Sequence, residues 1–266
     1  MIKSKLLPKD TKDIVDNLNN NTYNYYIKFM KLIEYNFYKK EFNKNILDKR
    51  EVFNPFQNDE NNKIMDCFCG QNNYFHLIAK TNLPLIIGLG SESVYEISIT
   101  LNYIYGCPYI PASSLKGCLR SLIIKKYFDK NENEAIRNED FIKIFGSAKK
   151  NKNDLGQKGG LLILDSYNSD NVFIKPDILT PHFPKYYKDP QNNPPSDTDT
   201  PIPINFLTVS GTFSIYAGLT ENINFSTNIF QSNNPLLFLK NEMIDMLKNH
   251  GIGAKTSVGY GYFEVE

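Results

Sequence analysis

The sequence lacks several features that would assign it quickly to a class of protein. Its 266 residues contain no apolar run long enough to span a membrane, and the first ten residues resemble neither a signal peptide nor a transit peptide. We therefore expect a cytoplasmic protein. The formal net charge is only +1, so any nucleic-acid site must come from a local cluster of basic side chains on one face.

Cysteine and histidine are scarce as well. The cysteines are Cys67, Cys69, Cys107 and Cys118. The first two are too close together for the usual zinc pairing and no second pair complements them, so we expect no metal and no other cofactor. The histidines are His76, His182 and His250. They show no paired-nucleophile signature, and Asp165 and Asp170 belong to no acidic cluster of metal-site type. We therefore expect a protein that is not an enzyme.

The length suits one elaborated domain or two small ones. Apolar side chains at helical spacing predict a helix within residues 11–42, and an Asn/Asp/Lys-rich composition predicts mainly loop over 43–73. We predict a helical and loop-rich N-terminal extension over 1–73 and one domain over 74–266.

The pattern of this domain predicts an α+β fold. Strands are expected at 74–87, 94–105, 161–164, 206–216 and 258–265, and helices at 113–128 and 234–250. Asn234 and Pro235 are typical of a helix start. Without one extra hairpin, the order is β-α-β-β-α-β, the ferredoxin-like (RRM-like) arrangement with both helices on one face of an antiparallel sheet. The other sheet face is predicted to be free.

Two insertions interrupt this pattern, at about 129–160 and 168–203. The first contains the basic stretch Lys149–Lys152 and is expected to be a mobile loop. The second carries aromatic residues in its first half and clustered Pro, Asn and Asp in its second half, which predicts an ordered and then a flexible segment. So long an irregular insertion is usually functional or disordered.

One predicted helix combines an apolar face with features of an anion site. Its apolar positions are Leu115, Cys118, Leu119, Leu122 and Ile123. Its opposite side carries Ser113, Lys116, Gly117 and Arg120. Ser113 and Ser114 suit an N-cap, so free helix amides and two cations together predict a phosphate site. The alternative is a capped amphipathic helix with solvated Lys and Arg.

The C-terminus is rich in glycine. The residues concerned are Gly251, Gly253, Gly259 and Gly261, with Lys255, Thr256 and Ser257 between them. Closely spaced glycines allow backbone amides to approach an anion. The spacing fits neither a Walker A loop nor a Rossmann fingerprint, so a nucleotide-binding enzyme is not supported. The alternative, which the glycines alone leave open, is a helix C-cap at Gly251 followed by an ordinary closing strand.

Both segments resemble motifs of one known family. Residues 110–120 read IPASSLKGCLR, similar to the IPGSSLKGALR motif of RAMP proteins, with Ala112 and Cys118 as departures. The C-terminal glycine spacing resembles the C-terminal signature of the same superfamily. Together with 179–187 and 201–209, these segments resemble, more narrowly, the subunit-six family of type III-B (Cmr) CRISPR effector complexes. The resemblance covers roughly residues 75–266.

The resemblance implies a non-catalytic RNA-binding subunit of a type III-B CRISPR ribonucleoprotein in antiviral defence. Such subunits hold the 3′ part of the crRNA and the guide–target duplex at the end of the backbone filament, and an inserted β-hairpin thumb disrupts that duplex locally. We expect the thumb within 168–207. The implied partners are crRNA, target RNA and other Cmr RAMP subunits: the repeated backbone subunit, the small helical subunit and the terminal RAMP subunit.

The RNA-binding residues that the motifs imply lie in the two segments. They are Ser113, Ser114, Lys116, Gly117, Arg120, Gly251, Gly253, Lys255, Thr256, Ser257, Gly259 and Gly261. Two alternatives remain open. A CRISPR repeat-processing endoribonuclease usually has two tandem ferredoxin-like folds and a general-base histidine, and residues 1–70 look too helical and loop-rich for the second fold. A protein-interaction scaffold would make no direct RNA contact.

Overall fold

The computed structural model describes residues 24–30, 35–36, 41–42, 50–56, 60–91, 98–148, 156–197, 199–201 and 203–266. The chain divides into two compact units. Unit 1 comprises Met1–Val52, Ile86–Pro108 and Phe173–Val209, and unit 2 comprises Phe53–Leu85, Tyr109–Val172 and Ser210–Glu266. In the part of the chain that the structure describes, every helix is too short or too polar to cross a lipid bilayer.

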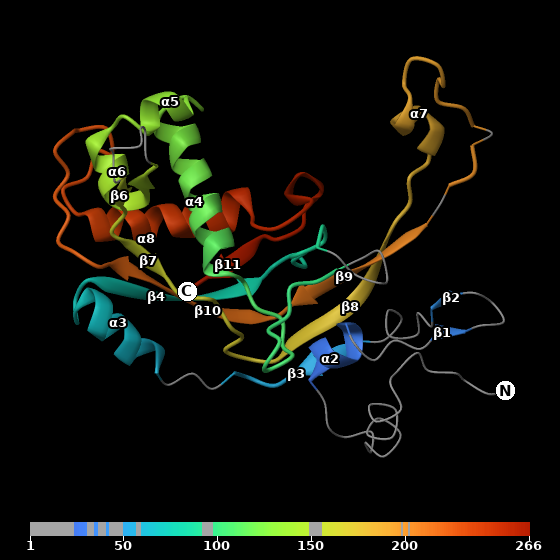
Figure 1. The fold of residues 1–266 in the computed structure, drawn as a ribbon, viewed down its shortest axis with the longest axis horizontal. Helices are drawn as coiled ribbons and strands as arrows, with labels where there is room; N and C mark the ends of the chain where they lie inside the picture. The colour runs from blue at the N-terminus through green and yellow to red at the C-terminus, as the bar shows by residue number, and fades with distance from the viewer. Residues whose placement is uncertain are drawn as a thin grey trace. The chain divides into compact units, whose positions relative to one another are not determined.

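Unit 2 is built on a four-stranded sheet (Figure 1). Its strands are β4 (Tyr74–Thr81), β7 (Leu161–Ile163), β10 (Thr212–Leu219) and β11 (Phe263–Val265). They lie in the order β11-β4-β10-β7, and every pairing is antiparallel. Alternation places Phe75, Leu77 and Ala79 on the buried face of β4. The strands predicted at 74–87, 161–164 and 258–265 are confirmed. The first ends early, at Thr81, and the last is limited to β11.

Two helices, α4 (Ala112–Tyr127) and α8 (Pro235–Asp245), lie on one face of this sheet (Figure 1). Asn234 caps α8 by accepting a 3.0 Å hydrogen bond from the Leu237 amide, and Pro235 takes the first helical position. One π-helical turn, η2 (Met246–His250), extends α8 to Gly251. Both predicted helices are therefore confirmed.

The opposite face of the sheet is partly covered by α3 (Asn61–Cys69). Met65 and Cys69, four residues apart, pack with Tyr216 of β10. Three partly buried side chains pack against this cluster: Tyr74, Leu162 and Leu164. Because residues four apart share one side of a helix, two apolar side chains suffice to hold α3 on the sheet. The predictions of a free sheet face and of mainly loop over 43–73 are therefore wrong for this segment.

The first insertion is ordered where the structure describes it. It forms α5 (Glu132–Ala135), α6 (Glu139–Phe145) and the hairpin strands β5 (Gly146–Ser147) and β6 (Gln157–Lys158). The prediction of a mobile loop is therefore wrong for the residues of these helices and strands. The basic stretch Lys149–Lys152 lies outside the described residues.

A buried carboxylate fixes α6. Asp140 is fully buried and accepts hydrogen bonds from the amides of Ser226 and Thr227 at 2.8 and 2.7 Å. The hydroxyls of the same two residues donate to it at 2.9 and 2.6 Å, and the Lys143 ammonium lies 3.1 Å away. These bonds tie the loop that precedes α8 to α6, the helix that positions the β5–β6 hairpin.

Unit 1 contains a three-stranded sheet in the order β3-β8-β9. The strands are β3 (Glu51–Phe53), β8 (Val172–Leu179) and β9 (Ile204–Ser210). The short helix α7 (Pro184–Lys188) lies at the far end of the arm that β8 and β9 form (Figure 1). The prediction of an irregular insertion over 168–203 is therefore wrong for the residues of β8, which form a strand. The strand predicted over 206–216 is two strands, because the chain breaks at Gly211 between β9 and β10.

Other sequence predictions fail in unit 1. Among the described residues of 11–42, the expected helix is present as α2 (Tyr25–Met30), whereas Tyr35–Asn36 (β1) and Glu41–Phe42 (β2) pair as antiparallel strands. The rest of that range lies outside the described residues. Of the strand predicted at 94–105, residues 94–97 lie outside them, and 98–105 show only one isolated bridge, from Leu101 to Pro108.

Candidate nucleic-acid interface

The start of α4 is closed by a residue from another segment. The Asp165 carboxylate accepts a 2.7 Å hydrogen bond from the Ala112 amide, and the amides of Ser114 and Leu115 bond to the Pro111 carbonyl. A carboxylate at this position also suits the helix dipole. Ser113 and Ser114 lie inside the helix and neither side chain caps it. The prediction that serines cap the helix is wrong, and these three amides are not free for phosphate.

The two predicted cations line the same flank of α4. The Lys116 ammonium donates a 2.7 Å hydrogen bond to the Leu161 carbonyl. Burial lowers the pKa of Lys116, and the positive charge of Lys158 lowers it further by a smaller amount. The Arg120 guanidinium pairs with the exposed Glu132 carboxylate at 2.8 Å. An exposed pair contributes little to stability, so a phosphate can replace Glu132 at small cost.

The predicted amphipathic pattern of α4 is confirmed. Leu115, Leu119, Leu122 and Ile123 are buried, and Cys118 is half-buried. Ser113, Gly117 and Ser121 are exposed at intervals of four residues, so they form one strip along the helix. A Cβ atom at Gly117 would meet nothing within 4 Å. Packing within the chain therefore does not require this glycine, and the strip allows a ligand close to the helix backbone.

The glycine-rich loop meets the other flank of α4. Burial raises the pKa of the Cys118 thiol, and a hydrogen bond from the Gly253 backbone acts in the opposite direction. This contact joins the two segments that the sequence singled out. The exposed strip of α4 thus lies between Lys116 and Arg120 on one side and the loop on the other.

Backbone hydrogen bonds also tie the glycine-rich loop to η2 and to the Pro84 segment. The Gly251 amide bonds to the Met246 carbonyl, so the helix C-cap predicted as the alternative is present. The Ile252 amide bonds to the Gly261 carbonyl, and the Gly261 amide to the Pro84 carbonyl, both at 2.9 Å. Gly251 and Gly261 are buried, whereas Gly253 and Ser257 are exposed and Lys255 and Thr256 are half-exposed. The outer part of the loop, 253–259, is the part open to a ligand.

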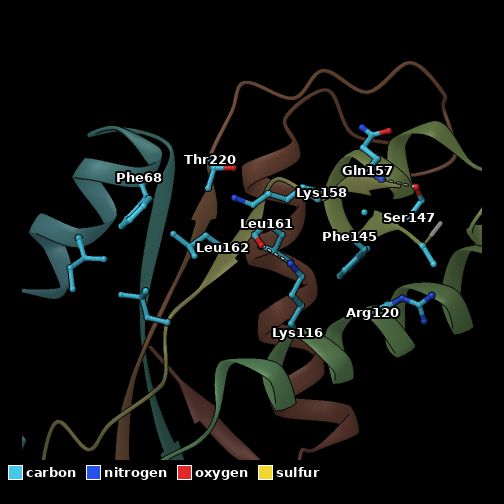
Figure 2. Close-up of a pocket in the computed structure, with 15 residues that line it drawn as sticks. Phe68, Lys116, Arg120, Phe145, Ser147, Gln157, Lys158, Leu161, Leu162 and Thr220 are labelled. Carbon is cyan, nitrogen blue, oxygen red and sulfur yellow. Dashed lines mark hydrogen bonds between the residues drawn. The ribbon is translucent and has the colours of Figure 1, made fainter. Parts of the chain in front are cut away.

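Next to the cationic flank of α4 is a cavity of about 660 Å³ between α3, α4 and the β5–β6 hairpin (Figure 2). Its cationic lining residues are Lys116, Arg120 and Lys158, and Phe68 of α3 forms its apolar side. Sequence reasoning named neither Lys158 nor Phe68 as a site residue. The glycine-rich run 156–160 around Lys158 is a signal in the sequence that could have pointed to Lys158. Nothing in the sequence indicates that α3 lies beside it.

The three histidines lie in separate places: His182 beside the Phe183 ring, and His250 with its Nε2 3.9 Å from the Asp245 carboxylate. His76 Nε2 lies 3.2 Å from the Ser214 hydroxyl, and its ring stacks on Tyr216 with 4.2 Å between centroids. Burial lowers the pKa of His76. Within the described ranges, no group of three His, Cys, Asp or Glu side chains is arranged to hold a metal ion.

Comparison with known proteins identifies the family. A model of the RAMP superfamily matches residues 79–264, and the chain belongs to this superfamily. The chain is similar to the CRISPR system Cmr subunit Cmr6 of Pyrococcus furiosus, with 28% identity over 231 residues that cover 68% of this chain and 65% of that protein. It is also similar to the CRISPR system CMR subunit Cmr6 of Saccharolobus solfataricus, with 25% identity over 191 residues, 70% of this chain and 55% of that protein.

The matched region thus spans between about half and two thirds of these relatives. Among solved structures, a chain of the type III-B Cmr-beta complex bound to cognate target RNA is similar in fold, with a TM-score of 0.51 and 24% identity. That match covers 77% of this chain and 61% of the other.

Proposed function

We propose that this chain is a non-catalytic RNA-binding subunit of a type III-B CRISPR ribonucleoprotein. It would hold the 3′ part of the crRNA and the guide–target duplex at the end of the backbone filament, beside other Cmr subunits. The similarity to two proteins named Cmr6 supports the assembly. The observation that carries the RNA contact is the exposed strip of α4 between two cations and the glycine-rich loop.

The chemistry of this strip suits a sugar–phosphate backbone. Gly117 has no side chain to hold a strand away from the helix, and Lys116 and Arg120 supply positive charge along one side. Backbone contacts of this kind position a nucleic acid without reading its sequence. Because Asp165 occupies the end of α4, we propose that the RNA crosses the side of the helix.

We further propose that the core of unit 2 is the ferredoxin-like fold and that β8, β9 and α7 form the thumb. The sequence of elements β4, α4, β7, β10, α8 and β11 and the sheet order β11-β4-β10-β7 support the first proposal. An arm of two strands with α7 at its far end supports the second (Figure 1).

Replacing Lys116 and Arg120 together with alanine tests the RNA contact. We expect crRNA binding to weaken by roughly tenfold or more, and the slope of log affinity against log salt to fall by about 1.4, since each lost contact to a single strand removes about 0.7. A filter-binding or anisotropy series in salt measures both. The matched control is Lys63→Ala with Lys248→Ala, which removes the same charge from two exposed positions outside the strip and the cavity lining. Unchanged affinity and slope would favour the scaffold alternative.

The proposal also predicts that the purified chain leaves RNA intact. A labelled CRISPR repeat RNA incubated with the chain, with and without divalent metal ions, should remain full-length on a denaturing gel. Cleavage that disappears on substitution of His76, His182 or His250 would support the endoribonuclease alternative instead. The same substitutions are expected to leave RNA affinity within about twofold, because none of the three lies on the strip of α4.

A further inference from the structure

We propose that the cavity between α3, α4 and the β5–β6 hairpin receives one unstacked nucleotide of the bound RNA. Its phosphate would lie against Lys116 and Lys158, and its base against Phe68. The inference rests on the proposed function, because it specifies what one nucleotide does where the strand passes α4.

The charges inside the cavity favour an anion. The bond to the Leu161 carbonyl directs the Lys116 ammonium into the cavity, and Figure 2 shows the Lys158 side chain on the same side, above Leu161. The two cations are close enough for Lys158 to lower the pKa of Lys116. None of the described residues that line the cavity is acidic. A phosphate between the two ammonium groups would relieve their mutual repulsion.

The other side of the cavity favours a base. Phe68 is 61% exposed, although Met65 and Cys69 of the same helix are buried against the sheet. Its ring faces the cavity across Leu162 from Lys158 and Lys116 (Figure 2). An exposed aromatic ring beside a cationic groove is the combination with which proteins bind single-stranded nucleic acids, since every base has a face that can stack.

Size and position agree with this ligand. The volume of about 660 Å³ lies within the range of roughly 300–1,000 Å³ of small-molecule sites. Ser147, Gln157 and Thr220 add polar atoms to the lining. Because Lys116 belongs both to the cavity and to the flank of the α4 strip, a nucleotide that leaves the strand there reaches the cavity directly.

Abasic scanning of a short single-stranded RNA with the 3′ sequence of the crRNA tests the inference. For the unaltered chain, one abasic position is expected to weaken binding by about 5- to 100-fold, the usual effect of one lost stacking contact. The same position should have no further effect on Phe68→Ala, because both changes remove the same contact. Leu237→Ala, an exposed apolar residue of α8, is the control. Lys158→Gln should reduce the salt slope by about 0.7.

The outcomes separate this inference from the proposed function. If the unaltered chain binds RNA but every abasic position affects it and Phe68→Ala equally, the nucleotide pocket is wrong and the proposed function stands. If the unaltered chain binds no RNA at any salt concentration, both are wrong. If adenosine monophosphate raises the melting temperature of the unaltered chain but not of Lys158→Gln, and no abasic effect is found, the cavity binds free nucleotides and the inference is overturned.

Discussion

Replacing Gly261 with alanine is expected to destabilise unit 2 by at least about 3 kcal/mol. A Cβ atom at this position would overlap the Ile252 carbonyl oxygen, a backbone atom held in place by the bonds that close the loop. The backbone φ of +76° also disfavours any side chain. Chemical denaturation followed by far-UV circular dichroism measures the loss.

Gly259→Ala is the matched control for this prediction. Gly259 also has a positive φ, of +102°, but the nearest atom to its added Cβ is Leu83 Cδ1 at 3.6 Å, an ordinary contact. The expected loss is only about 1–2 kcal/mol of conformational strain. If the outer loop contacts RNA, this folded variant should nevertheless bind crRNA more weakly. Equal destabilisation by both changes would contradict the distinction between the inner and the outer glycines.

Asp140→Asn is expected to cost at least about 3 kcal/mol of stability, because two amides and two hydroxyls would lose a buried charged acceptor. The β5–β6 hairpin and its cavity should loosen with it, since Asp140 holds α6 to the loop before α8. Urea denaturation measures the effect. Glu139→Gln is the control, as this neighbour is exposed and should change stability by less than about 1 kcal/mol.

The effect of Asp140 should depend on pH. Burial opposes its charge, but the hydrogen bonds from Thr227 and Ser226 outweigh burial and lower the pKa of Asp140 well below its usual range. The pKa in the unfolded chain is about 3.9. The stabilisation is therefore complete at neutral pH, begins to decrease below about pH 4, and decreases further as the pH approaches the folded-state pKa. The difference in unfolding free energy between the parent chain and Asp140→Asn should shrink in that window. A constant difference down to pH 3 would contradict it.

Sequence periodicity correctly predicted the helices that are specified by their own apolar spacing and capping residues. The apolar positions of α4 and the start of α8 at Asn234 and Pro235 are local signals, and both helices form as predicted. The strand predicted over 98–105 does not form, because a local turn at Asn102 and a distant partner both act on this segment. The Asn24 side chain donates to the carbonyls of Tyr103 and Ile104 at 2.7 Å, and these bonds stabilise a turn in a stretch of strand-like composition. The Asn102 side chain also accepts hydrogen bonds from the amides of Ile104 and Tyr105 at 2.9 and 3.0 Å, which is a local turn signal. No pattern within the stretch indicates the distant partner Asn24.

The same limit applies to the candidate interface. Helical spacing correctly placed Lys116 and Arg120 on one side of α4, because spacing along a helix fixes direction. It assigned the cap of α4 to serines within the helix, whereas the carboxylate of Asp165 from a later segment takes that place. The cavity is assembled from α3, α4 and the β5–β6 hairpin. Contacts between segments so far apart in the chain are not visible in local periodicity.

The position of α3 determines where a shortened protein can begin. The superfamily match starts at residue 79, which lies inside β4, and α3 precedes it altogether. A fragment cut at that boundary would lose most of a central strand and expose Tyr216, Leu162 and Leu164, which α3 covers. An uncovered apolar face of this kind promotes self-association. Expression fragments of this chain therefore need to start before Glu60, upstream of the start of the superfamily match.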